Sequence, residues 1–186
     1  GGTAKIMGID ILENPSKARS NLGYMAQKFS LYGNLTLRQN LEFFASVYGI
    51  NFLNKDKRVD EIIDIFNFHD IQDMKSQDLP LGFKQRLSLA CAVIHNPPIL
   101  FLDEPTSGVD VIARREFWNH ITSLAKLGVT ILVTTHFMDE AEYCNRISLF
   151  YKGETIALGT PYELKTKANA DNMEQAFVNL IKESGK

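Results

Sequence analysis

Hydrophobic and polar residues follow three different patterns along the chain. In residues 1–27, short apolar pieces alternate with turn residues, which predicts small β-structure. In residues 28–96, apolar side chains recur at helical spacing, and Pro97 and Pro98 end the last of these helices. Beyond them, apolar runs alternate with helical stretches. The pattern therefore predicts an α/β core that is interrupted by a helical insert.

The helical insert is expected to hold three amphipathic helices. Thr36 and Gln39 have the spacing of a capping box, which predicts that a helix begins there. A second apolar stripe runs from Val59 to Phe66, and a third ends at Ile94. We therefore assign residues 28–96 to a helical subdomain.

Two strands are predicted after this subdomain. Residues 99–102 form a continuous apolar run, which is typical of a strand covered on both faces. A helix with its apolar side at residues 117–125 follows, and residues 129–135 predict a second buried strand.

A hairpin and two helices are predicted in the last part of the chain. Residues 146–151 and 155–158 flank a turn, which predicts an antiparallel hairpin. Thr160 followed by Pro161 is typical of a capped helix start. The predicted organisation is an α/β core of residues 1–27 and 97–165, the helical subdomain, and a C-terminal helix in residues 166–186.

Composition narrows the class of protein. A chain of 186 residues, 45% hydrophobic and 23% charged, can bury a core, and its formal charge of -2 provides no general attraction to nucleic acid. Cys91 and Cys144 lie far apart without metal-type neighbours, which is typical of reduced thiols. No apolar stretch approaches the roughly 18 residues of a membrane span. We expect a soluble chain with no nucleic-acid partner.

Two adjacent carboxylates, Asp103 and Glu104, follow the apolar run of residues 99–102. The carboxyl ends of parallel strands face the crevice where open α/β sheets bind ligands. Acids at a strand end are usually ordinary solvated residues. Here the buried run before them and the Pro-Thr-Ser-Gly-Val-Asp turn of residues 105–110 favour a catalytic site.

Residues 99–110 resemble the Walker B and D-loop segment of ABC-type ATPases. The resemblance implies that Asp103 holds Mg²⁺ through water and that Glu104 polarises the water that attacks ATP. It also places Asp110, in the D-loop, among the nucleotide-binding residues. His136 follows the second strand as the switch histidine of the family does, which implies contact with the terminal phosphate. A lone histidine is more often structural, but a position at the same sheet edge favours this role.

Gln27 lies where the β-pattern gives way to the helical subdomain, and it resembles the Q-loop glutamine of the family. The resemblance implies that Gln27 is a ligand of Mg²⁺ or of the attacking water. Phe29, Leu31 and Tyr32 would line the groove that receives a helix of the membrane-spanning partner. Burial in the core explains these three side chains equally well.

Residues 79–87 occupy the place of the ABC signature, which is usually Leu-Ser-Gly-Gly-Gln. The resemblance implies that Gly82 and Phe83 belong to a nucleotide site completed in the opposite subunit. Pro80 replaces the serine and has neither a hydroxyl nor an N–H, so this site is expected to be weakened. The alternative is that the segment is merely the start of an amphipathic helix.

The sequence contains no G-x-x-x-x-G-K-[ST] loop, which would hold the β- and γ-phosphates. The resemblance begins just downstream of where that loop belongs. We therefore expect an α/β fold of the P-loop NTPase type, truncated at its N-terminus, with an α-helical subdomain. Such a chain is expected to lack a sheet strand and, by itself, to be inactive.

The resemblance covers nearly the whole chain and is closest to the second nucleotide-binding half of tandem ATPases from ABC-2-type multidrug exporters. It implies an ATPase with ATP and Mg²⁺ as cofactors, bound peripherally at the cytoplasmic face of the cell membrane. The implied partners are ABC-type membrane-spanning subunits and a second nucleotide-binding domain in a head-to-tail dimer. Three alternatives stay open: a poorly hydrolytic module that completes a partner's ATP site, a non-functional fragment, and a soluble ABC protein acting on ribosomes or DNA.

Overall fold

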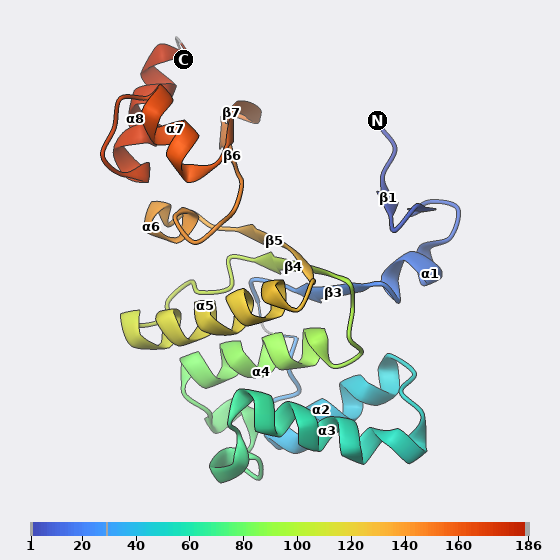
Figure 1. Ribbon diagram of the computed structural model, residues 1–186. Coiled ribbons are helices and arrows are strands. Elements are labelled where there is room, and N and C mark those ends of the chain that lie inside the picture. The colour runs from blue at the N-terminus through green and yellow to red at the C-terminus, as the bar shows by residue number, and fades with distance from the viewer. Residues whose placement is uncertain (1, 29, 185–186) are drawn as a thin grey trace. The chain divides into compact units, whose positions relative to one another are not determined.

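The computed structural model describes residues 2–28 and 30–184 (Figure 1). The chain divides into two compact units, Gly1–Thr134 and Thr135–Lys186. Within the described residues, no helix combines the length and the apolar character that a membrane crossing requires.

A three-stranded parallel sheet lies in the first unit, in the order β3-β4-β5 (Figure 1). Its strands are β3 (Leu22–Met25), β4 (Ile99–Asp103) and β5 (Thr130–Thr134). The register pairs Met25 with Leu102, and Asp103 with Thr134, so the three strands end close to one another. The preceding segment holds an antiparallel pair and a short helix: β1 (Lys5–Ile6), β2 (Ile9–Asp10) and α1 (Pro15–Arg19).

The two faces of this sheet differ in burial. Leu100 and Leu102 are fully buried on the face that packs against the helices α4 (Leu81–Val93) and α5 (Val111–Lys126). On the other face, Tyr24 of β3 and Leu132 of β5 belong to one row of paired residues across the sheet. Tyr24 is 53% exposed and Leu132 is 57% exposed. The prediction that both strands are covered on both faces is therefore wrong for the first unit, because α4 and α5 lie on the same face.

Three helices form the predicted helical region, namely α2 (Leu37–Val47), α3 (Phe52–Phe66) and α4. The capping box at the start of α2 is confirmed, since Thr36 accepts the N–H of Gln39 and the Gln39 side chain accepts the N–H of Thr36. Two short 3₁₀ turns, η1 (His69–Ile71) and η2 (Ser76–Asp78), lie between α3 and α4. The apolar stripes of α2 and α3 pack on each other, with Leu37, Leu41, Val59, Ile62, Ile63 and Phe66 buried.

Glycine permits close helix packing at two positions. A Cβ atom at Gly23 in β3 would clash with the carbonyl oxygen of Ala92 in α4. A Cβ atom at Gly82 in α4 would lie 2.7 Å from the Cβ of Ala113 in α5. Both glycines therefore let α4 lie close to its neighbours.

The second unit consists of α6 (Met138–Ala141), the strands β6 (Ile147–Tyr151) and β7 (Glu154–Gly159), and the helices α7 (Pro161–Lys167) and α8 (Met173–Glu183). The predicted hairpin is confirmed, and both turn residues, Lys152 and Gly153, have the positive φ of the preferred hairpin turn. The capped start of α7 at Thr160 is also confirmed. One face of the hairpin packs on α7 and α8 around Leu149, Leu164 and Met173.

Candidate functional site

Polar side chains gather where β3, β4 and β5 end. Asp103 is the last residue of β4, Glu104 follows it, and Gln27 lies two residues beyond the end of β3. The Nε2 atom of Gln27 donates a hydrogen bond of 2.8 Å to Oε2 of Glu104. The structure thus brings together two residues that lie in separate motifs of the sequence.

Thr134, the last residue of β5, joins the same cluster. Its hydroxyl donates a hydrogen bond of 2.6 Å to Oδ1 of Asp103. The backbone N–H of Glu104 donates to the carbonyl oxygen of Thr134 at 3.0 Å and to its Oγ1 at 3.1 Å. The sequence did not indicate this threonine, because only the pairing of β4 with β5 places it beside Asp103.

Glu104 has a left-handed backbone, with φ of 44°. A residue other than glycine in this region costs on the order of 1–3 kcal/mol, and such residues concentrate at functional sites. The two acceptors on Thr134 hold the backbone of Glu104 in this conformation. The strained backbone thus belongs to the residue whose carboxylate is predicted to polarise the attacking water.

Asp110 is the N-cap of α5. Its Oδ1 accepts hydrogen bonds of 3.0 Å from the N–H groups of Ile112 and Ala113. This capping role was not predicted from the sequence, although an aspartate directly before a helix is a typical cap. Its assignment to nucleotide binding stays a prediction.

The segment in the place of the ABC signature forms the first turn of α4. Pro80 is the N-cap and provides no side-chain bond to the helix. Gly82 lies against Ala113, and the ring of Phe83 lies 4.3 Å from the guanidinium carbon of Arg86.

Arg86 also connects α4 to α5, because a guanidinium nitrogen of Arg86 lies 3.6 Å from a carboxylate oxygen of Glu116. Burial lowers the pKa of Arg86, and the charge of Glu116 opposes that shift. Gly82 and Phe83 therefore help to pack α4 in this structure, whereas their contact with a nucleotide stays a prediction.

His136 lies in the second unit, two residues after β5 ends. Its ring is exposed and lies 4.2 Å from the ring of Phe137. Beside it, Thr135 donates a hydrogen bond of 2.6 Å to Oε2 of the buried Glu140 and accepts the N–H of Phe137 at 3.0 Å. Its role as a phosphate sensor stays a prediction.

Of the three residues predicted to line a partner groove, Phe29 lies outside the described residues. Leu31 is half-buried and lines a cavity of about 30 Å³ with Tyr24, Phe44, Tyr48 and others. Tyr32 is 48% exposed, and its ring packs on Phe43 at 4.4 Å. These side chains are therefore partly packed and partly accessible.

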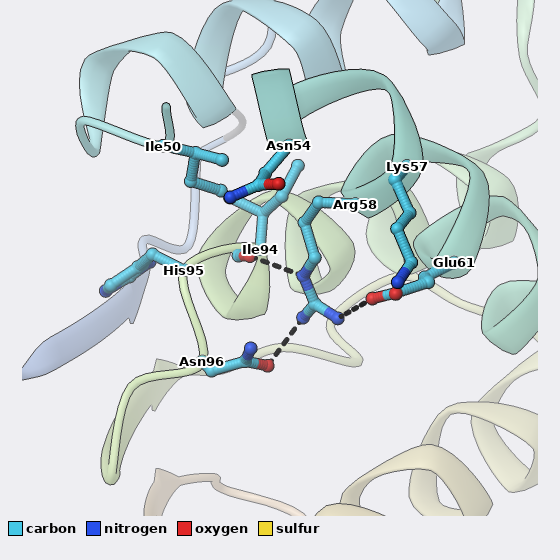
Figure 2. Close-up of a pocket in the computed structure, with 8 residues that line it drawn as sticks. All are labelled: Ile50, Asn54, Lys57, Arg58, Glu61, Ile94, His95 and Asn96. Atoms are coloured by element: carbon cyan, nitrogen blue, oxygen red, sulfur yellow. Dashed lines mark hydrogen bonds and ion pairs between the residues drawn. The ribbon is translucent and has the colours of Figure 1, made fainter. Parts of the chain in front are cut away.

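A second cavity, of about 380 Å³, lies between α3 and the end of α4 (Figure 2). Arg58 crosses it and donates to the carbonyl oxygen of Ile94 at 2.7 Å and to Oδ1 of Asn96 at 2.6 Å. The same guanidinium pairs with Glu61 at 3.1 Å. Two of these partners, Ile94 and Asn96, lie just after α4, so Arg58 caps the carboxyl end of that helix. We therefore interpret the cavity as a gap between packed helices.

The donors at the sheet edge fit a magnesium ion. Carboxylate, amide and hydroxyl oxygens are hard donors, and Mg²⁺ in nucleotide sites usually takes one or two carboxylates, substrate phosphates and several waters. Within residues 2–28 and 30–184, no group of three or more histidine, cysteine, aspartate or glutamate side chains could enclose a metal by itself. Asp103 is therefore suited to an ion that obtains its other ligands from phosphate and water.

The fold is that of an ATP-binding domain of the ABC type. The family model for "ABC transporter" matches residues 1–107, and the chain belongs to this family. Its members bind nucleotide through this domain. The solved "ATP binding subunit of ABC transporter" has a TM-score of 0.81 at 24% identity and covers 95% of this chain and 75% of its own. This likeness confirms the predicted α/β fold of the P-loop NTPase type.

Among curated relatives, the "Probable multidrug ABC transporter ATP-binding protein YbhF" of Escherichia coli (strain K12) is 55% identical over 185 residues. The match covers 97% of this chain and 32% of YbhF, so the chain spans about a third of that relative. The "Daunorubicin/doxorubicin resistance ATP-binding protein DrrA" of Streptomyces peucetius is 33% identical, over 92% of this chain and 52% of its own length. The solved cbiO1 of Clostridium perfringens, described as part of the transporter complex cbiONQ, is 26% identical with a TM-score of 0.76, over 86% of this chain and 66% of its own.

Proposed function

We propose that this chain is the ATP-binding and hydrolysing part of an ABC exporter for drugs or other small molecules. The observation that carries the proposal is the contact of Gln27 with Glu104 beside Asp103, at the carboxyl ends of three parallel strands. Relatives named for multidrug transport and for daunorubicin resistance support the assignment to efflux.

In the proposed mechanism, Asp103 would hold Mg²⁺ through water, and the bound ion would supply neutralisation of charge on the phosphates. Glu104 accepts a hydrogen bond from the attacking water and aligns it. Gln27, already bonded to Glu104, would help to position that water or would bind the ion. His136 donates to the terminal phosphate. Phosphoryl transfer depends mainly on such positioning and charge neutralisation, so these residues need no covalent step.

The proposal includes the partners of the domain. The chain would bind ABC-type membrane-spanning subunits through the side of the Leu31 and Tyr32 segment, and would lie peripherally at the cytoplasmic face of the membrane. It would pair head-to-tail with a second nucleotide-binding domain, and Gly82, Phe83 and Asp110 would contact the nucleotide of that partner. We further propose that the chain corresponds to the second nucleotide-binding half of a tandem-domain subunit, without its phosphate-binding loop. The match covers only 32% of the length of YbhF, which supports a place for the chain within a longer subunit.

One observation favours a second candidate, a poorly hydrolytic module that completes the ATP site of its partner. Pro80 caps α4 without a side-chain bond and has no N–H, so the start of α4 offers fewer donors to a phosphate than a serine would. The intact pair of Asp103 and Glu104 favours hydrolysis instead.

Replacing Glu104 with Gln in the assembled transporter tests the proposal. We expect single-turnover hydrolysis to fall by about 10²- to 10³-fold, the typical cost of losing one electrostatic group at a reacting centre, while ATP binding is retained. Glu13→Gln, at an exposed glutamate near α1, is the matched control and should hydrolyse ATP as the wild type does. Equal rates for Glu104→Gln and wild type would contradict hydrolysis at this site and favour the second candidate.

A further inference from the structure

Thr134 contacts both acidic residues at the end of β4. Its hydroxyl donates to Oδ1 of Asp103 at 2.6 Å, and the N–H of Glu104 donates to the same hydroxyl at 3.1 Å. We infer that Thr134 is a positioning residue, which fixes the ion-binding carboxylate of Asp103 and the backbone of Glu104 in one arrangement. This inference rests on the proposed function of the site.

The direction of the hydroxyl proton follows from its two partners. A threonine hydroxyl has one proton to donate and two lone pairs that accept. Because the Glu104 N–H can only donate, it uses a lone pair, and the proton is directed to Asp103. A short O–H···O bond of this length is typical of a hydroxyl that donates to a charged carboxylate.

The pairing of β4 with β5 places the Thr134 hydroxyl beside the carboxylate of Asp103. Asp103 and Thr134 are register partners on β4 and β5, so their side chains lie next to each other on the same face of the sheet. Threonine is branched at Cβ and has few χ1 rotamers, so it loses little freedom when its hydroxyl is held. The carbonyl of Thr134 also accepts the Glu104 N–H at 3.0 Å, which ties the left-handed residue to β5.

A fixed carboxylate matters for an octahedral ion. Mg²⁺ demands near-ideal geometry, so a carboxylate that holds the ion through water must itself be oriented, and residues that hydrogen-bond the groups around an ion supply such orientation. Loss of such a partner typically weakens metal binding by about 10- to 100-fold. Thr134 would therefore act on the affinity for the ion, through Asp103, rather than on ATP directly.

The test compares Thr134→Val, Thr134→Ser and Thr130→Val in the assembled transporter, each in a Glu104→Gln background that slows turnover. Valine has the shape of threonine without the hydroxyl and favours strands, and the Thr134 side chain is exposed, so the fold should be retained, which circular dichroism checks. Thr130 lies on the same strand and face, and its hydroxyl makes no side-chain hydrogen bond within the described residues. It provides the matched control.

The readout is the dissociation constant of Mn²⁺ in the presence of ATP, measured by electron paramagnetic resonance. We expect Thr134→Val to weaken Mn²⁺ binding about 10- to 100-fold, while Thr134→Ser and Thr130→Val bind as the parent does. Unchanged affinity in Thr134→Val would overturn the inference, as would an equal loss in Thr134→Ser. If the parent itself bound no Mn²⁺ with ATP, the proposed function would fail instead.

Discussion

The side chains of Gln27 and Glu104 meet although 77 positions separate them along the chain. Sequence identified both residues, because each belongs to a segment that resembles a family motif. It did not identify Thr134, since a hydroxyl at the end of a strand is common and nothing in its own segment distinguishes it. Only the pairing of β4 with β5 reveals that this hydroxyl contacts Asp103. Local sequence patterns can thus identify reactive groups, whereas the residues that orient those groups are recognised only from contacts in the folded structure.

His95 should make stability depend on pH. It lies in the connection between α4 and β4, and its ring stacks on Tyr48 at 3.7 Å. Burial lowers the pKa of His95 below its ordinary value of 6.5; the backbone of Leu22 opposes this shift, and the positive charge of Arg58 adds to it. The unfolded chain therefore takes up a proton before the folded chain does. Below about pH 6.5 the free energy of unfolding should fall as the pH falls.

Replacing His95 with Phe keeps a ring on Tyr48 and removes the titrating group. Urea unfolding between about pH 5 and pH 7 should show a smaller loss of stability in this variant than in the wild type. A pH dependence that is the same in both proteins would show that His95 does not contribute. His69→Gln, at an exposed histidine, is the control for the general effect of removing an imidazole.

At the scale of helices and strands, sequence was most successful where the signal is local. The capping boxes at Thr36 and Thr160 and the hairpin turn at Lys152 each need only a few neighbouring residues, and all are confirmed. The faces of the sheet were not predicted, because an apolar run does not say which elements cover it. Leu132 has an apolar side chain like Leu100, yet α4 and α5 lie on the face of Leu100 alone.

The N-cap of α5 gives a prediction at this scale. Asp110→Ala removes the acceptor of two N–H groups and should lower the free energy of unfolding by about 1 kcal/mol. Asp110→Asn keeps a capping oxygen and should lose only a small part of that energy. Urea unfolding measures both variants. If both were as stable as the wild type, the cap would contribute little, and the role of Asp110 would have to be sought in nucleotide contact.

At the scale of the whole molecule, the sheet of the first unit exposes apolar side chains on one face. Parallel sheets are normally covered on both faces, so a row with Tyr24 at 53% and Leu132 at 57% exposure is unusual. The sequence led us to expect that the sheet lacks a strand, but it could not indicate which residues would be exposed as a result. The described structure locates that surface on β3, β4 and β5.

The exposed row should bind hydrophobic dyes. We expect the isolated chain to increase the fluorescence of anilinonaphthalene sulfonate, and the double variant Tyr24→Thr, Leu132→Thr to do so much less, because threonine suits a strand but offers little apolar area. Leu127→Thr removes a leucine that is 82% exposed at the end of α5, away from this row, and serves as the control. If the double variant and the control gave equal signals, the row would not be the dye-binding surface.

The left-handed backbone of Glu104 also affects how mutational scans of this domain should be interpreted. A β-branched replacement there would lose the carboxylate and also resist the conformation, so a single deleterious score would combine a chemical and a conformational defect. Asparagine tolerates this conformation and lacks the carboxylate. A comparison of Asn with Val at position 104 would therefore separate the two defects within one library.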